Sequence, residues 1–187
     1  KYLFDPNLLK AQFSSKAKFS NNKEDLKKFL KKSDYFVTCI GSEHGKARYL
    51  ISRELEKKKI KPLNIISKYA YVSNRKIIGK GVQIFPYSVV HHQSKVGDYC
   101  IFNTGSIVEH DCLVGDGVHV MPGAVIGGNT SIGDYVTIGL NATVMPQLKI
   151  EEGAFIGAGA VVTKNVKKNE IVAGNPAKFL KIMNHKV

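Results

Sequence analysis

Apolar residues recur at every sixth position from Ile66 to Val162. Seventeen successive positions are apolar, and all of them except Phe102 are Ile or Val. A second column, four residues after the first, runs from Ala70 to Val166 and holds mostly small residues, and glycine often follows the first column directly. An α-helix cannot keep one face on a six-residue period, whereas short strands joined by turns can. The pattern predicts a parallel β-helix in which three hexapeptides form each triangular coil around the β-branched column.

The first 62 residues follow a different pattern. Residues 22–32, NKEDLKKFLKK, predict a helix with Asn22 as its N-cap, and residues 34–41, DYFVTCIG, predict a buried strand. Residues 45–59, GKARYLISRELEKKK, predict a second helix. One side of this second helix carries Leu50, Ile51 and Leu55. Strand, glycine and helix in this order form half of an α/β nucleotide-binding unit.

Two domains follow from these patterns. Residues 1–62 are predicted to form a partial, Rossmann-like α/β domain, whose preceding strand is KYLFDP at residues 1–6. The glycine-rich first turn of such a unit is expected to come before residue 1. Residues 63–187 are predicted to form the β-helix, and the short amphipathic stretch after the Gly174-Asn175-Pro176 turn is expected to cap its open end.

Charge and cysteine content narrow the classes of protein. The formal net charge is +13, and residues 1–62 hold 16 Lys and Arg against 7 Asp and Glu. Most of these lysines fall in the predicted helices, and no basic stripe alternates with aromatic residues, so nucleic acid is not expected as a partner. No run approaches the roughly 18 apolar residues of a membrane span. Three cysteines without CxxC spacing indicate buried, reduced thiols in a cytoplasmic protein.

Glu109, His110 and Asp111 stand side by side after the inward position Val108, so they are expected outside the core. Imidazole, with an ordinary pKa of about 6.5, is suited to proton transfer near neutral pH, and a carboxylate on its other nitrogen fixes the tautomer. Adjacent side chains on a strand diverge, so only one of the two carboxylates easily reaches the ring. His92, 18 residues earlier, is expected one coil below His110. There it would bind substrate, disfavour protonation of His110 through like charge, or be a plain surface residue.

The hexapeptide columns and GNPAK at residues 174–178 resemble the left-handed β-helix acyltransferases. NTGSIVEHDC at 103–112 and GVHVMPGAVIGG at 117–128 are similar to the sugar N-acetyltransferases of the bacillosamine, perosamine and sialic-acid O-acetyltransferase group. The resemblance implies left-handed coils, acetyl-CoA as co-substrate, a nucleotide-linked amino sugar as acceptor, and a homotrimer with its site between two β-helices. It also implies an enzyme that needs no metal.

The same resemblance implies roles for individual residues. It makes His110 the general base and favours Asp111 over Glu109 as its partner. His119 falls at the acetyl-CoA contact. The residues implied to line the coenzyme channel are Gly128, Leu140 and Ala158. The strand-end Asp5 and the Gly41 turn match the nucleotide-binding pattern.

Two further roles come from the residues themselves. A backbone N–H near a glycine can stabilise the charge that develops on the thioester oxygen, and Gly128 is the candidate. Lysines near the end of the β-helix, among them Lys164 and Lys178, are expected to attract the phosphates of the coenzyme.

Three other functions stay open from the sequence. His91, His92, His110 and His119 make a metal-dependent hydratase of the carbonic anhydrase type conceivable, because zinc needs three converging imidazoles. A non-catalytic trimeric scaffold predicts no binding of coenzyme A. O-acylation of a sugar hydroxyl would use the same base as N-acylation.

Overall fold

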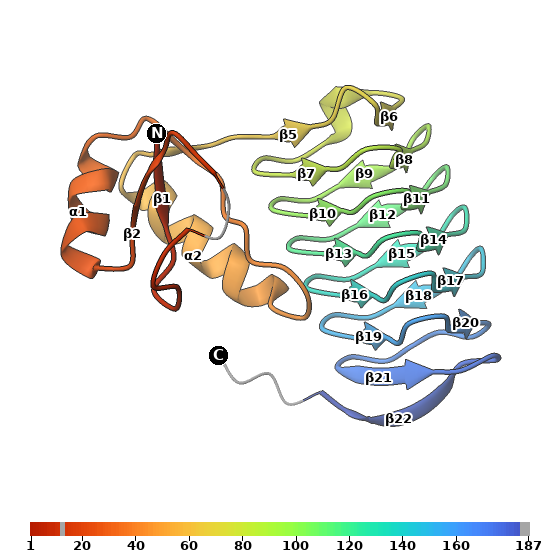
Figure 1. The fold of residues 1–187 in the computed structure, drawn as a ribbon. Coiled ribbons are helices and arrows are strands. Elements are labelled where there is room, and N and C mark those ends of the chain that lie inside the picture. The colour runs from red at the N-terminus through yellow and green to blue at the C-terminus, as the bar shows by residue number, and fades with distance from the viewer. Residues whose placement is uncertain (12–13, 184–187) are drawn as a thin grey trace.

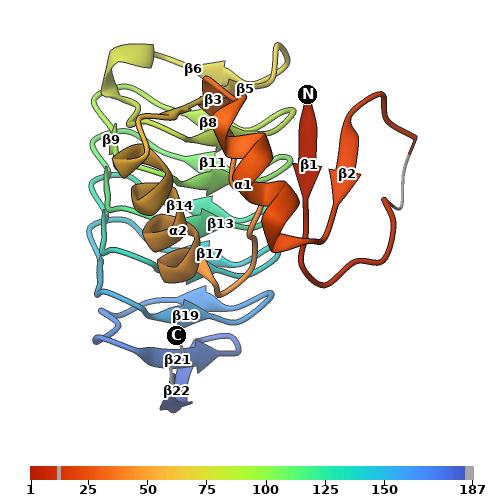
Figure 2. The same cartoon turned by 90° about the vertical axis from the view of Figure 1, so that its left-hand side faces the viewer.

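The computed structural model describes residues 1–11 and 14–183 and consists of an α/β part packed beside a three-sided β-helix (Figures 1 and 2). In the α/β part, the strands β1 and β2 pair in parallel, and so do β3 and β4. Its elements are β1 (Tyr2–Phe4), β2 (Lys18–Ser20), α1 (Lys23–Lys31), β3 (Tyr35–Phe36), α2 (Gly45–Lys57) and β4 (Lys61–Pro62).

Three parallel sheets form the sides of the β-helix. The first sheet contains β5 (Ile65–Ile66), β7 (Gln83–Ile84), β10 (Ile101–Phe102), β13 (His119–Val120), β16 (Thr137–Ile138), β19 (Phe155–Ile156), β21 (Glu170–Ala173) and the antiparallel β22 (Lys178–Ile182). The second contains β6 (Tyr71–Val72), β8 (Val89–Val90), β11 (Ile107–Val108), β14 (Val125–Ile126), β17 (Thr143–Val144) and β20 (Val161–Val162). The third contains β9 (Lys95–Val96), β12 (Leu113–Val114), β15 (Ser131–Ile132) and β18 (Lys149–Ile150). A short 3₁₀ turn, η1 (Arg75–Ile77), interrupts the first coil.

The predicted six-residue period is confirmed. Ile101 pairs with Gln83 on one side and with His119 on the other, so neighbouring coils are in register at 18 residues. Each strand from β5 to β20 has two residues, of which the first points outward and the second inward. The inward column is buried from Ile84 to Val162, with Val108 and Ile126 fully inaccessible, and its first three residues, Ile66, Val72 and Ile78, are partly buried. One continuous apolar core therefore runs along the β-helix.

Tyrosine and glycine alternate at the turns between the third and first sheets. All five positions of this column have a left-handed backbone: Gly81, Tyr99, Gly117, Tyr135 and Gly153. A Cβ atom on Gly81 would overlap the ring of Tyr99, and one on Gly117 would lie 2.8 Å from the ring of Tyr135. Each tyrosine ring thus covers the glycine of the preceding coil.

Helix α2 docks on this tyrosine column. The ring of Tyr49 lies between those of Tyr99 and Tyr135, with centroids 5.7 and 5.6 Å away in edge-on geometry. Such aromatic pairs contribute about 0.5–1.5 kcal/mol each beyond the area they bury. The α/β part is consequently held along the side of the β-helix rather than at its end (Figures 1 and 2).

Helix α1 begins as predicted, because the Asn22 side chain accepts a hydrogen bond from the Glu24 N–H at 2.8 Å. The predicted strand at residues 34–41 is wrong in length and burial. Only Tyr35–Phe36 is a strand, and the side chains of Tyr35 and Val37 are exposed. This strand pairs with β4 alone within the described residues, so little covers it.

The cysteine prediction holds for two of three residues. Cys100 and Cys112 are buried thiols, whereas Cys39 is exposed, because it follows the short β3 in the sparsely covered part of the α/β segment. All three are free cysteines.

The expected apolar side of α2 does not face the β-helix. Leu50 and Ile51 are exposed, and the helix buries Gly45, Arg48 and Ser52 instead. The glycine permits a close approach, because a Cβ on Gly45 would overlap the carbonyl oxygen of Gly117. Backbone proximity and polar contacts, rather than an apolar stripe, set this packing.

The predicted C-terminal cap is a strand. Strand β21 continues the first sheet beyond β19, and β22 pairs with β21 as an antiparallel edge strand whose five residues are all exposed. It extends the first sheet as an exposed edge strand, and Ala177 just before it packs against the core. Residues 184–187 of the predicted second domain lie outside the described residues.

Candidate active site

His110 lies on the turn that follows β11, between the second and third sheets, and 59% of its side chain is exposed. The preceding Val108 points inward, so the turn residues project away from the core, as predicted. The ring Nδ1 and the Asp111 Oδ2 are 2.8 Å apart. A carboxylate accepts at that position, so Nδ1 carries the proton and Nε2 is left as an acceptor.

Backbone conformation decides which carboxylate reaches the imidazole. Asp111 has φ +58°, a left-handed conformation that turns its side chain back toward the ring, and its N–H donates to the His92 carbonyl at 3.0 Å. Asp111, rather than Glu109, therefore makes the contact with His110. The two alternatives left open by the residue pattern are separated by this one backbone angle.

Gly128 lies one coil above His110, and its neighbour Asn129 donates its N–H to the His110 carbonyl at 2.9 Å. A Cβ on Gly128 would lie 2.8 Å from both Cε1 and Nε2 of the imidazole. The ring therefore lies across Gly128, in space that is free only because glycine has no side chain. Among the described residues, none accepts a hydrogen bond from the Gly128 N–H.

His110 belongs to a column of turn residues that repeats every 18 positions on one corner of the β-helix. We name this corner the histidine edge. It consists of His92, His110, Gly128, Pro146 and Lys164. His92 and Lys164 are both exposed. The predicted coenzyme contact Lys164 is thus aligned with the candidate base, three coils away.

Leu140 and Ala158 lie elsewhere. They occupy the turns between the first and second sheets, and the Leu140 carbonyl accepts from the Gly159 N–H at 2.8 Å. The second sheet separates this opposite edge from the histidine edge. A single chain therefore does not bring the predicted channel residues Leu140 and Ala158 to His110.

His119 is also remote from His110. It lies on β13 of the first sheet, is 6% exposed, and has Nδ1 3.3 Å from the Ser42 carbonyl oxygen, to which it donates. Burial, with the nearby Arg48 charge as a second cause, lowers the pKa of His119 to about 4. Its Nε2 has no hydrogen-bond partner among the described residues. The side chain is a neutral imidazole with one acceptor atom unused.

The predicted nucleotide residues are in two places. Asp5 follows β1, and its carboxylate accepts the Asn7 N–H at 2.8 Å. Gly41 lies beside His119, whose Cε1 would be 3.7 Å from a Cβ at that glycine. Lys178 begins β22, at the end of the β-helix far from both.

His92 is an exposed residue, and its ring lies 5.1 Å from that of His91. The His91 ring in turn lies 6.0 Å from that of Tyr71. In the described part of the chain, no three His, Cys, Asp or Glu residues are placed to hold a metal ion.

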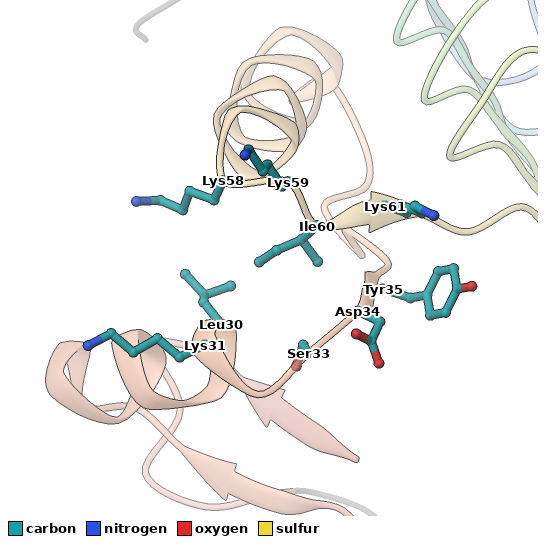
Figure 3. A pocket seen from close by; sticks show the side chains of 9 residues that line it. All are labelled: Leu30, Lys31, Ser33, Asp34, Tyr35, Lys58, Lys59, Ile60 and Lys61. Carbon is teal, nitrogen blue, oxygen red and sulfur yellow. The ribbon is translucent and has the colours of Figure 1, made fainter.

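Two cavities lie away from the histidine edge. One, of about 410 Å³, opens between the C-terminal ends of α1 and α2, with Leu30 and Ile60 facing each other and lysines around the rim (Figure 3). The lysine side chains at this rim are favoured because the C-termini of helices carry partial negative charge. The other, of about 590 Å³, is a depression on the third sheet around Leu113. Neither contains a residue predicted for the site.

Sequence reasoning missed one buried charged residue, Arg48 of α2, which is fully inaccessible. The signal was available in the spacing of Gly45, Arg48 and Ser52, which share one face of the helix. Only the side of this helix that carries Leu50, Ile51 and Leu55 was noted from the sequence.

A family model described as bacterial transferase hexapeptide (six repeats) matches residues 75–110, 111–144 and 129–164. The acetyltransferase domain of PglB from Neisseria gonorrhoeae is 34% identical, with 74% of this chain and 68% of that one covered and a TM-score of 0.64. The chain belongs to the hexapeptide-repeat transferases. The predicted family and the predicted left-handed β-helix are thereby confirmed.

Two other hexapeptide-repeat proteins match nearly the whole chain. PerB from Caulobacter crescentus, in complex with CoA and GDP-perosamine, is 26% identical, with a TM-score of 0.83 and coverage of 94% of this chain and 82% of that one. WeeI from Acinetobacter baumannii AYE is 29% identical, with a TM-score of 0.81 and coverage of 96% and 85%. The similarity therefore extends over the α/β part as well as the hexapeptide repeats.

No helix of the described part is long and apolar enough to cross a membrane.

Proposed function

We propose that this hexapeptide-repeat protein transfers an acetyl group from acetyl-CoA to the amino group of a nucleotide-linked amino sugar. The observation that carries the proposal is the 2.8 Å contact between His110 Nδ1 and Asp111, which leaves Nε2 as an exposed proton acceptor. As the amine nitrogen attacks the thioester carbonyl, Nε2 takes the proton that the nitrogen loses, and Asp111 stabilises the resulting imidazolium. Collapse of the tetrahedral intermediate expels the coenzyme thiolate, to which that proton can return.

Gly128 is suited to stabilise the intermediate. Its N–H has no acceptor among the described residues and lies beside the imidazole. One such donor aimed at a developing oxyanion contributes about 3–4 kcal/mol in well-studied acyl-transfer enzymes. Nε2 of His110 would then take the proton of the attacking amine, while the Gly128 N–H stabilises the oxyanion of the same tetrahedral intermediate.

Binding of acetyl-CoA, the acetyl donor, is proposed to require a second copy of the chain. The outward residues of the second sheet form a half-buried and mostly apolar row that comprises Val89, Ile107, Val125, Thr143 and Val161. Packing of this row in a homotrimer would bring the opposite edge of one copy, with Leu140 and Ala158, to the histidine edge of the next. The exposed Lys164 and Lys178 would then attract the coenzyme phosphates.

Acceptor binding is assigned to the α/β part. Asp5 and Gly41 follow strands there, and the related PerB holds GDP-perosamine while the PglB domain of Neisseria gonorrhoeae holds acetyl coenzyme A.

Buried free thiols at Cys100 and Cys112 suit a cytoplasmic enzyme, where both substrates are made. His92, on the histidine edge, is a candidate contact for the sugar.

The test is acetyl transfer by wild type and by His110→Ala with UDP-, GDP- and dTDP-linked amino sugars. We expect kcat to fall by about a hundredfold or more in His110→Ala, because the proton acceptor is lost, with coenzyme A binding and oligomeric state unchanged. His91→Gln, a replacement next to the histidine edge, should retain full activity. Wild-type rates in His110→Ala would refute the assignment.

Product analysis separates the remaining functions. An ester product would indicate O-acylation, and activity lost on chelation and restored by zinc would favour the hydratase class. Absence of coenzyme A binding by calorimetry would favour a scaffold.

A further inference from the structure

Arg48 is a buried cation without a carboxylate partner among the described residues. Its Nε donates to the Tyr99 carbonyl at 2.7 Å, and its Nη2 donates to the carbonyls of Gly117 and Val118 at 2.7 and 3.3 Å. Its Nη1 donates to the Ile40 carbonyl at 2.6 Å. One guanidinium thus joins two coils of the β-helix to the loop that follows β3.

Burial of a charged guanidinium destabilises the folded state unless each of its N–H donors has an acceptor. An isolated buried charge is strongly disfavoured, and burial lowers the pKa of Arg48 to about 10, which still leaves it protonated at neutral pH. Packing alone does not require it, because Tyr49 already docks α2 between two tyrosines. Arginine adds a planar fork that fixes several acceptors at defined positions.

The carbonyl of Ile40 leads directly to the proposed nucleotide turn. Gly41 follows, and then Ser42, which has φ +51°. The Ser42 carbonyl accepts from His119 Nδ1 at 3.3 Å and from the Thr137 hydroxyl at 3.4 Å. The turn is therefore held at residue 40 by Arg48 and at residue 42 by two side chains of the first sheet.

We propose that Arg48 is a positioning residue for the acceptor substrate. It holds the Ile40–Gly41–Ser42 turn at a fixed place on the β-helix, so that a nucleotide bound at this turn presents its amino sugar in register with the acyl-transfer edge. The inference rests on the proposed function and adds a residue that acts through the turn, without touching either substrate.

The test compares Arg48→Lys and Arg48→Met with wild type. Lysine keeps the charge and most of the volume but places only one nitrogen among carbonyls on three segments, so it should fold and yet loosen the turn. We expect KM for the nucleotide sugar to rise by about tenfold or more in both variants, because small misplacements of a reacting group are costly. The dissociation constant of coenzyme A should change by less than about twofold, since the histidine edge is not involved.

Arg53→Met is the matched control. Arg53 lies on the same helix, is exposed, and pairs with Glu56 at 2.8 Å, so its loss removes an equal charge without affecting the turn. All kinetic constants should stay at wild-type values. Transfer to an amino sugar without its nucleotide should also be equal in wild type and Arg48→Lys, because such an acceptor does not use the turn.

Several results would overturn the proposal. Unfolding of both Arg48 variants, or lower thermal stability with an unchanged KM for the nucleotide sugar, would make Arg48 a purely structural residue. Failure of the proposed function is separately visible, because wild type would then transfer no acetyl group. Calorimetry would still measure the binding of UDP, GDP and dTDP at the turn directly. Weaker nucleotide binding in Arg48→Lys than in wild type supports the positioning role, and equal binding contradicts it.

Discussion

His110 on the histidine edge and His119 at the buried contact between the α/β part and the β-helix are imidazoles in contrasting environments. His110 is exposed, with the Asp111 carboxylate 2.8 Å from its Nδ1. His119 is buried near the Arg48 charge, with a carbonyl on Nδ1, and its pKa is lowered to about 4. The difference shows how one fold provides both a group that can gain a proton and a group that stays neutral. Each prediction below tests one half of this contrast.

The largest expected effect concerns His119 and the pH dependence of stability. Because burial lowers its folded pKa from 6.5 to about 4, the unfolded chain binds a proton more readily in this interval. Its contribution is fully present above about pH 6.5 and is lost as the pH falls toward 4, with a magnitude on the order of 3 kcal/mol. Denaturant unfolding at several pH values measures it.

His119→Gln is the control for this effect. Glutamine can still donate to the Ser42 carbonyl but does not titrate, so the acid-dependent loss between pH 6.5 and 4 should shrink. An unchanged loss in His119→Gln would assign the pH dependence to other groups. Proton NMR of the imidazole should show no titration of His119 between pH 6 and 8.

Gly128→Ala tests the histidine edge by displacing the imidazole. The added methyl group would lie 2.8 Å from Nε2, and the ring is an exposed side chain that can swing away at small cost to folding. We expect kcat to fall by about a hundredfold with little change in thermal stability, because the base leaves its productive position. A large loss of stability with normal kcat per folded molecule would contradict this geometry.

The smallest effect is expected from the carboxylate. Asp111→Asn should lower kcat by about tenfold, since both side chains are exposed and solvent weakens the pair. Glu109→Gln should have no such effect, because Glu109 makes no contact with the ring. Steady-state kinetics with both variants decides between the carboxylates, and a greater loss in Glu109→Gln would reverse their roles.

Much of the fold could be predicted because the repeat is a local property of the sequence. The six-residue period alone places Val108 inside and therefore His110 outside. The partner of His110 depends on the left-handed φ of Asp111, which recurs at the same position of the neighbouring coils, for example at Gln93 and Asn129. The spacing of apolar residues predicts the six-residue period but not this backbone angle within it. Asparagine and aspartate tolerate that conformation without requiring it, so no rule on residue type decides the question.

The environment of His119 could not be predicted for a different reason. Its hydrogen-bond partner, Ser42, is 77 residues away in the chain and belongs to a segment without the repeat. That segment contacts the β-helix through the close backbone approach at Gly45 and the hydrogen bonds of Arg48, and neither kind of contact leaves an apolar periodicity in the sequence. Long-range polar packing of this kind has no one-dimensional signature.

The tyrosine and glycine column limits how such a protein can change in length. Each ring occupies the space vacated by the glycine of the coil before it, so the repeating unit at this corner is two coils rather than one. Duplication of a single 18-residue coil would bring two rings together or leave one more glycine uncovered. Growth or shortening of the rod by 36 residues would preserve the alternation, so gene duplications that preserve this corner should add coils in pairs.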